Sequence, residues 1–130
     1  MGEALLRFKL SQQSNTAMEV RSAGIQPLLG HPPDPLAIQL MAEKNLDISG
    51  YHGEKLTEEL AHWADIILVM ELKHKRHIEN RFPSTRGRVF RMLEDEQQDI
   101  ADPYRQGLQA FKIAEEQIQR GADQWAEKLA

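Results

Sequence analysis

The sequence contains no cysteine among its 130 residues, so it holds no disulfide framework and no thiol of its own. For a chain without disulfides, the cytoplasm is the default location. No apolar run approaches the roughly 20 residues that a membrane span needs, and the residues after Met1 show no signal peptide. The formal charge of −4, with acidic and basic residues mixed along the chain, argues against nucleic acid or a membrane surface as a partner.

The organisation of the chain is simple. No internal repeat, low-complexity tract or long linker divides it. Its length suits one domain of ordinary size with a buried core of its own. We therefore expect a single domain over residues 1–130.

The predicted helices follow from apolar spacings of three and four and from their capping residues. Asp34, followed by a proline, and Thr57 are the capping residues that begin the second and third helices. The last helix has the clearest periodicity, with apolar side chains from Leu108 to Leu129. The expected helices cover residues 1–12, a segment from 35 onward, a short segment after 57, residues 71–81 and residues 105–129.

Three strands are expected, over residues 17–22, 66–70 and 89–93. The second is apolar at every position, which predicts a strand buried on both faces of a parallel sheet. Strands that alternate with helices in this order indicate an α/β domain with right-handed crossovers. Sites in such folds form at the carboxyl ends of the strands, and Asp102 follows the third strand toward that edge.

The segment Asp102-Pro103-Tyr104 carries the residues best suited to chemistry. The proline stiffens the turn and favours an extended backbone at Asp102. The apolar Ile100 and Ala101 before it predict a carboxyl group that is partly removed from water, with a raised pKa. Such a group could protonate a departing phenolate. Asp-Pro is also a common opening of an ordinary turn, and spacing alone favours that reading.

A basic cluster over residues 73–77 contains His74 and His77, three positions apart on a predicted helix. No third ligand accompanies the two histidines, so we expect no metal site there. The cluster is interpreted as a solvated helix face.

A series of short motifs along the chain resembles the low-molecular-weight protein tyrosine phosphatase family. They are Ser22-Ala23-Gly24, the segment 30–35, His52 with residues 55–57, the segment 64–71 and Asp102-Pro103-Tyr104. They occur in the family's order and at about its spacing, and the resemblance covers essentially the whole chain. The short approach to Asp102 and the single tyrosine after Pro103 are similar to the bacterial branch.

The resemblance implies a flavodoxin-like three-layer fold and hydrolysis of phosphotyrosine through a phosphocysteine intermediate. It implies that Asp102 is the general acid and base and that Tyr104 forms a wall of the substrate cleft. Ser22 and His52 match positions that support the phosphate loop from behind. No metal or cofactor is implied. The partners would be phosphotyrosine proteins, among them a bacterial tyrosine kinase that controls exopolysaccharide export.

The sequence departs from the family at its start. The family begins with a strand and a Cys-(five residues)-Arg phosphate loop, and its first helix then continues in a form like the residues after Met1. We therefore expect an N-terminal truncation that removes the nucleophile, the phosphate-binding arginine and the central strand. A chain of this kind would be inactive alone, and its sheet would lack a partner for the strands at 17–22 and 66–70.

Three alternatives remain open. The first is a non-catalytic pseudophosphatase or binding remnant that offers the Tyr104 face to a partner. The second is an arsenate reductase relative, which ranks lower because that chemistry needs further cysteines. The third is a plain α/β structural protein. Turnover of a phenyl phosphate distinguishes an enzyme from the others.

Overall fold

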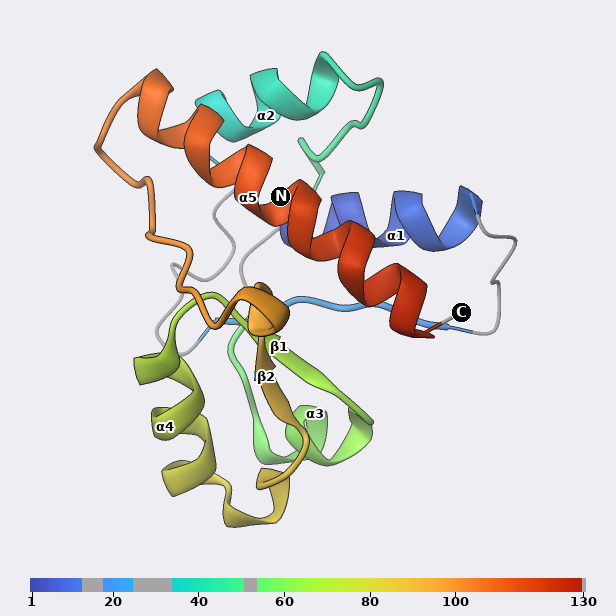
Figure 1. Cartoon of the computed structure of the whole chain (residues 1–130), viewed down its shortest axis with the longest axis vertical. Coiled ribbons are helices and arrows are strands. Elements are labelled where there is room, and N and C mark those ends of the chain that lie inside the picture. The colour runs from blue at the N-terminus through green and yellow to red at the C-terminus, as the bar shows by residue number, and fades with distance from the viewer. Residues whose placement is uncertain (13–17, 25–33, 51–53, 130) are drawn as a thin grey trace.

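The computed structural model describes residues 1–12, 18–24, 34–50 and 54–129. In these residues three helices come first, and then strands and helices alternate along the chain (Figure 1). The elements are α1 (Gly2–Gln12), α2 (Pro35–Ala42), α3 (Glu58–Trp63), β1 (Ile67–Val69), α4 (Leu72–Arg81), the 3-10 turn η1 (Pro83–Thr85), β2 (Val89–Arg91), the 3-10 turn η2 (Glu94–Glu96) and α5 (Leu108–Leu129).

The helix starts are set by the capping residues that the sequence predicts. The Asp34 side chain accepts a hydrogen bond of 2.9 Å from the backbone N–H of Leu36, so it caps α2. The Thr57 hydroxyl accepts a bond of 3.2 Å from the N–H of Leu60 at the start of α3. The last helix begins at Leu108, three residues later than predicted, because Gly107 has a left-handed backbone with φ of 89°.

The sheet of the described residues has two parallel strands, with Ile67 opposite Val89 and Val69 opposite Arg91. The predicted strand over residues 17–22 is wrong for its described part, since residues 18–22 form no strand. Only an isolated bridge between Gly24 and Lys55 follows it. A strand is defined by the hydrogen-bond ladder with a neighbouring strand, and in the described part of the chain no strand pairs with residues 18–22.

The prediction that residues 66–70 are buried on both faces is also wrong. Val69 alone is buried, and Ile66 is 37% exposed. Among the described residues, β1 has β2 as its single strand neighbour. The apolar row therefore keeps part of its surface in water, as expected for a strand at an open edge.

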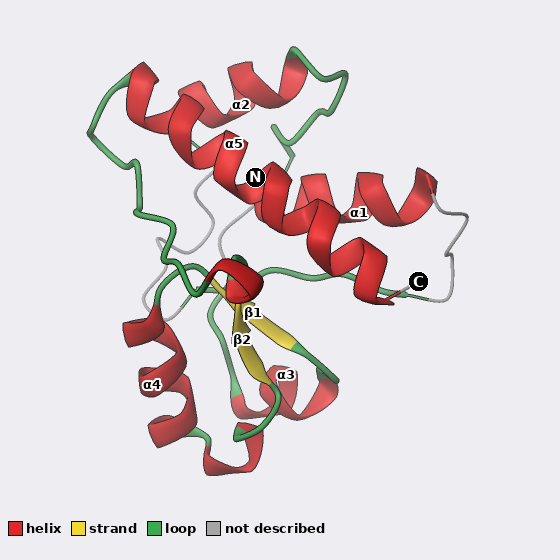
Figure 2. Ribbon diagram, viewed as in Figure 1, coloured by secondary structure: helices red, strands yellow, loops and turns green. Residues whose placement is uncertain are grey.

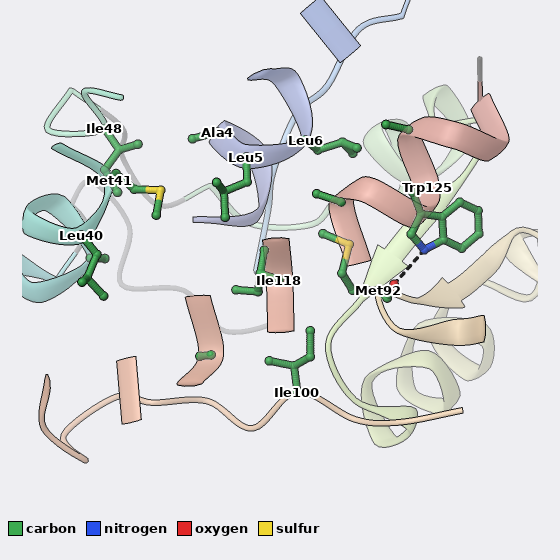
Figure 3. Close-up of a cluster of buried hydrophobic side chains, with 14 of the residues drawn as sticks. Ala4, Leu5, Leu6, Leu40, Met41, Ile48, Met92, Ile100, Ile118 and Trp125 are labelled. Atoms are coloured by element: carbon green, nitrogen blue, oxygen red, sulfur yellow. Dashed lines mark hydrogen bonds between the residues drawn. The ribbon is translucent and has the colours of Figure 1, made fainter. Parts of the chain in front are cut away.

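The main core lies between the helices (Figure 3). Helix α5 packs along α1, and α2 lies beside them, while α3 and α4 lie near the strands (Figure 2). Leu5, Leu40 and Met41 are almost fully buried at the centre of this core. The predicted stripe of α5 is buried except at its two ends, where Leu108 is exposed and Leu129 is half-buried. Its buried members are Phe111, Ala114, Ile118, Ala122 and Trp125.

A smaller cluster of Val69, Ile78 and Val89 joins α4 to the two strands. In the part of the chain that the structure describes, no helix is both long enough and apolar enough to span a membrane.

Candidate active site

The segment before Asp102 is held against the end of β1. The N–H of Ile100 donates a hydrogen bond of 2.8 Å to the carbonyl oxygen of Met70. The Ile100 side chain is 1% exposed and belongs to the main core (Figure 3). This anchor places Asp102 just beyond the carboxyl end of β1, at the edge where the α/β pattern predicts a site.

A small cavity of about 160 Å³ opens at this edge. Its lining combines apolar side chains from the core with three titratable groups, Glu71, His74 and Asp102. The remaining lining residues are Met70, Ile100, Ala101, Pro103, Ala114 and Ile118. Another cavity of about 230 Å³ lies at the end of α2, around Ile38 and Leu46, away from these groups.

The Asp102 carboxylate forms its own turn. Its Oδ1 atom accepts a hydrogen bond of 3.0 Å from the N–H of Tyr104, so the turn predicted from Asp-Pro is present. Asp102 is exposed, and the expected removal of the carboxyl group from water is therefore not found. The Tyr104 ring is 48% exposed, with the Arg105 guanidinium 5.1 Å from its centre.

The first turn of α1 lies beside the same cavity. A Cβ atom added at Gly2 would lie 3.2 Å from Met70 Cε and 4.0 Å from Ile118 Cγ2, and both of these residues line the cavity. The positive end of the α1 dipole is therefore directed to the neighbourhood of Asp102. Burial lowers the pKa of the Met1 amino group, and the Glu3 carboxylate opposes this effect.

The two predicted support residues differ in what can be said of them. Ser22 is exposed, and its hydroxyl donates a hydrogen bond of 2.7 Å to Glu3 Oε1 in the first turn of α1. Glu3 also pairs with Arg7 at 3.1 Å. Ser22 is thus held beside the start of α1, whereas His52 lies outside the described residues.

Asp99 is a further site residue that sequence reasoning missed. Its Oδ1 atom accepts hydrogen bonds of 3.0 Å from the N–H of Leu72 and 3.0 Å from Nη1 of Arg91. The bond from Arg91, followed by that from Leu72, lowers the pKa of the Asp99 carboxyl. These partners lie 27 and 8 positions away in the sequence, so no local pattern announces the contact.

The basic cluster over residues 73–77 is only partly a solvated face. His74 is half-buried and lines the cavity, and the ammonium of the half-buried Lys75 lies 5.9 Å from the centre of the Phe90 ring. Lys73, Arg76 and His77 are exposed as predicted. Among the described residues, no group of three or more histidine, aspartate or glutamate side chains could hold a metal ion.

A family model described as low molecular weight phosphotyrosine protein phosphatase matches residues 1–130. The chain is 47% identical, over 129 residues, to a probable low molecular weight protein-tyrosine-phosphatase EpsP of Ralstonia nicotianae, with 99% of this chain and 86% of the relative covered. It is 34% identical to the phosphatase Etp of Escherichia coli, with 100% of this chain and 85% of that protein covered.

Solved structures agree with the sequence comparison. The crystal structure of the tyrosine phosphatase Wzb of Escherichia coli in complex with sulphate matches with a TM-score of 0.90 and 33% identity. The match covers 99% of this chain and 87% of that chain. The α/β fold with a parallel sheet, predicted from the sequence, is therefore the fold of these phosphatases.

Proposed function

Since the chain belongs to the low molecular weight phosphotyrosine protein phosphatase family, we propose that its residues supply the acid–base half of a bacterial phosphotyrosine phosphatase. The whole chain, residues 1–130, acts as one domain in this proposal. The observation that carries it is the cavity at the carboxyl end of β1, which Asp102 lines and beside which α1 begins.

The chemistry has two steps. A thiolate attacks the phosphorus of phosphotyrosine, the P–O bond to the tyrosine breaks, and protonated Asp102 gives its proton to the departing phenolate oxygen. In the second step Asp102 takes a proton from a water molecule, which attacks the phosphocysteine and releases inorganic phosphate and the thiolate. These 130 residues contain no cysteine, so the thiolate has to come from polypeptide beyond them.

The position of α1 supports a mechanism in which Asp102 supplies the acid and other polypeptide supplies the thiolate. A phosphate loop that leads into the first turn of α1 would present its thiolate and the transferred phosphoryl group to the helix N-terminus, where backbone N–H groups favour negative charge. Gly2 and the cavity share Met70 and Ile118 as neighbours. A phosphoryl group at that helix end would therefore be close to the Asp102 loop. An arginine of the same loop would hold the equatorial oxygens as a fork.

We assign Tyr104 to the substrate-facing wall of the cleft. Its side chain is exposed, and its backbone N–H is hydrogen-bonded to the Asp102 carboxylate two residues earlier. Ser22 supports the start of the phosphate loop through its place beside Glu3. His52 is assigned to the same role on the motif alone. No metal or cofactor takes part in the proposed reaction.

The proposed substrates are phosphotyrosine side chains of proteins in the cytoplasm. A bacterial tyrosine kinase that controls exopolysaccharide export is proposed as the partner on the family resemblance; the relatives EpsP and Wzb are named as protein-tyrosine-phosphatases.

Turnover of phenyl phosphate tests the proposal. The 130-residue chain is expected to release no phosphate above a buffer control, since nothing in it replaces a thiolate. The completed chain, in which a strand and a Cys-(five residues)-Arg loop precede Met1, is expected to be active. Its Asp102→Asn variant should lose roughly 10²–10⁴-fold in kcat. An Asp102→Asn variant of the completed chain with unchanged kcat would exclude Asp102 as the acid.

The absence of cysteine also favours a second candidate, a binding remnant that offers the Tyr104 face to a partner. This candidate predicts that the 130-residue chain binds a phosphotyrosine peptide without turnover and that Tyr104→Ala weakens the binding. Isothermal titration calorimetry with the phosphorylated and unphosphorylated peptides measures this binding and distinguishes a binding remnant from an enzyme.

A further inference from the structure

Asp99 joins three parts of the molecule at one oxygen atom. Helix α4 begins at Leu72, and the side chain of the N-cap residue Glu71 makes no capping hydrogen bond. The cap comes instead from Asp99, which accepts the N–H of Leu72 at 3.0 Å. The same oxygen accepts Nη1 of Arg91 at the end of β2, also at 3.0 Å. A carboxylate at this place is favoured by both the helix dipole and the guanidinium.

The position of Asp99 in the chain gives this junction a consequence for Asp102. The next residue, Ile100, donates its N–H to Met70 at the end of β1. Two successive residues are therefore hydrogen-bonded to other elements: Asp99 to the start of α4, and Ile100 to the end of β1. Between Ile100 and α5 the described chain makes only local turns, at Asp102 to Tyr104 and at Pro103 to Gln106. The pair is thus the nearest firm support of the exposed Asp102 turn.

Arg91 is well placed to keep Asp99 fixed. Its side chain is only 14% exposed, and it also lies 3.6 Å from Glu94. An arginine that is nearly buried loses little entropy when it forms a further bond, because packing already restricts it. The arginine side of this pair is therefore restrained, while the Asp99 side chain is 47% exposed.

We propose that Asp99 is a positioning residue, which fixes the Asp102-Pro103-Tyr104 turn over the cavity through the N-terminus of α4 and Arg91. The inference rests on the proposed function, since it gives the turn its purpose. Loss of Asp99 should leave the core folded and release the turn.

Backbone ¹⁵N relaxation on the labelled 130-residue chain tests this. In Asp99→Ala the order parameters of the amides of Ala101, Asp102 and Tyr104 should fall from about 0.85 to below about 0.6, while those of α1 and α5 stay unchanged. Asp99→Asn keeps an oxygen that accepts both hydrogen bonds, so it should restore the order. A purely structural role would lower the melting temperature without this local change.

Asp95 offers a matched control. Its side chain is 48% exposed, against 47% for Asp99. Asp95 lies in the turn η2 and pairs with Lys128 of α5. Asp95→Ala should leave Ala101, Asp102 and Tyr104 as ordered as in the unchanged chain. The proposal is overturned if Asp99→Ala leaves the turn rigid, or if Asp95→Ala loosens it equally.

A second variant decides the matter if Asp99→Ala does not fold. Leu72→Pro removes the donor to Asp99 at the first position of α4, where proline is tolerated. It should lower the order parameters of Ala101, Asp102 and Tyr104, and an unchanged turn would overturn the proposal. The relaxation data measure the order of the turn and do not depend on catalysis. A kcat unaffected by Asp102→Asn in the completed chain would instead refute the proposed function and leave the positioning role intact.

Discussion

Gly121 lies where α5 packs directly against Met92, the residue that follows β2. A Cβ atom added there would lie 2.5 Å from Met92 Cγ and 2.8 Å from the Met92 carbonyl oxygen, and both distances are far below ordinary contact. The carbonyl cannot easily move. It accepts the indole N–H of Trp125 at 3.0 Å. The backbone N–H of Met92 in turn donates to the Val69 carbonyl at 2.7 Å. Gly121→Ala should therefore push α5 away from the end of β2.

The magnitude follows from two opposing effects. Overpacking a buried site costs about 1–3 kcal/mol, and distortion of the bond from Trp125 adds to that cost. The better helix propensity of alanine returns about 1 kcal/mol. We expect Gly121→Ala to lower the free energy of unfolding by about 1–3 kcal/mol, a change of roughly 1 M in the urea midpoint.

The assay is urea unfolding followed by tryptophan fluorescence. Trp125 is 6% exposed and Trp63 is 44% exposed, so the signal change reports mainly the core. Gly50→Ala is the control, because no atom of the described residues lies within 4 Å of its added Cβ and its φ is not left-handed. That change should alter stability by less than about 1 kcal/mol. A Gly121→Ala protein as stable as the unchanged chain would refute the close packing of α5 on Met92.

Three further changes test other parts of the structure. Asp34→Ala removes the cap of α2 and should cost about 1 kcal/mol in thermal unfolding. Trp125→Phe leaves the Met92 carbonyl without its indole donor and should cost about 1–3 kcal/mol. Ion pairs and hydrogen bonds hold the pKa values of Asp99 and Glu96 below their usual 3.8 and 4.5. Their contribution is complete above those values, so the urea midpoint should fall as the pH drops below about 4.5.

The helices could be predicted because their signals are local. Asp34 and Thr57 cap the helices that follow them, and the spacing of apolar residues in α5 marks the side that packs on α1. The strands were predicted less well. Residues 18–22 alternate as a strand should, but a strand depends on a partner that the sequence pattern does not identify.

The site likewise combines local features that the sequence predicts with long-range contacts that it does not. The turn between Asp102 and Tyr104 spans three residues, and the Asp-Pro pair predicts it. The cap that Asp99 gives to α4 joins residues 27 positions apart, so its partner could be found only in the folded chain. The half-buried position of His74 follows likewise from the packing of α4 beside the cavity.

The dependence of rate on the leaving group tests the central claim most directly. In the completed chain, kcat/KM of Asp102→Asn, which covers the steps up to departure of the phenolate, should be compared for phenyl phosphate and for 4-nitrophenyl phosphate, whose leaving group is more acidic and needs less protonation. If Asp102 donates the proton, the variant loses roughly 10²–10⁴-fold on phenyl phosphate and much less on the nitrophenyl ester. Equal losses on the two esters, or none on either, would contradict that role for the carboxylate.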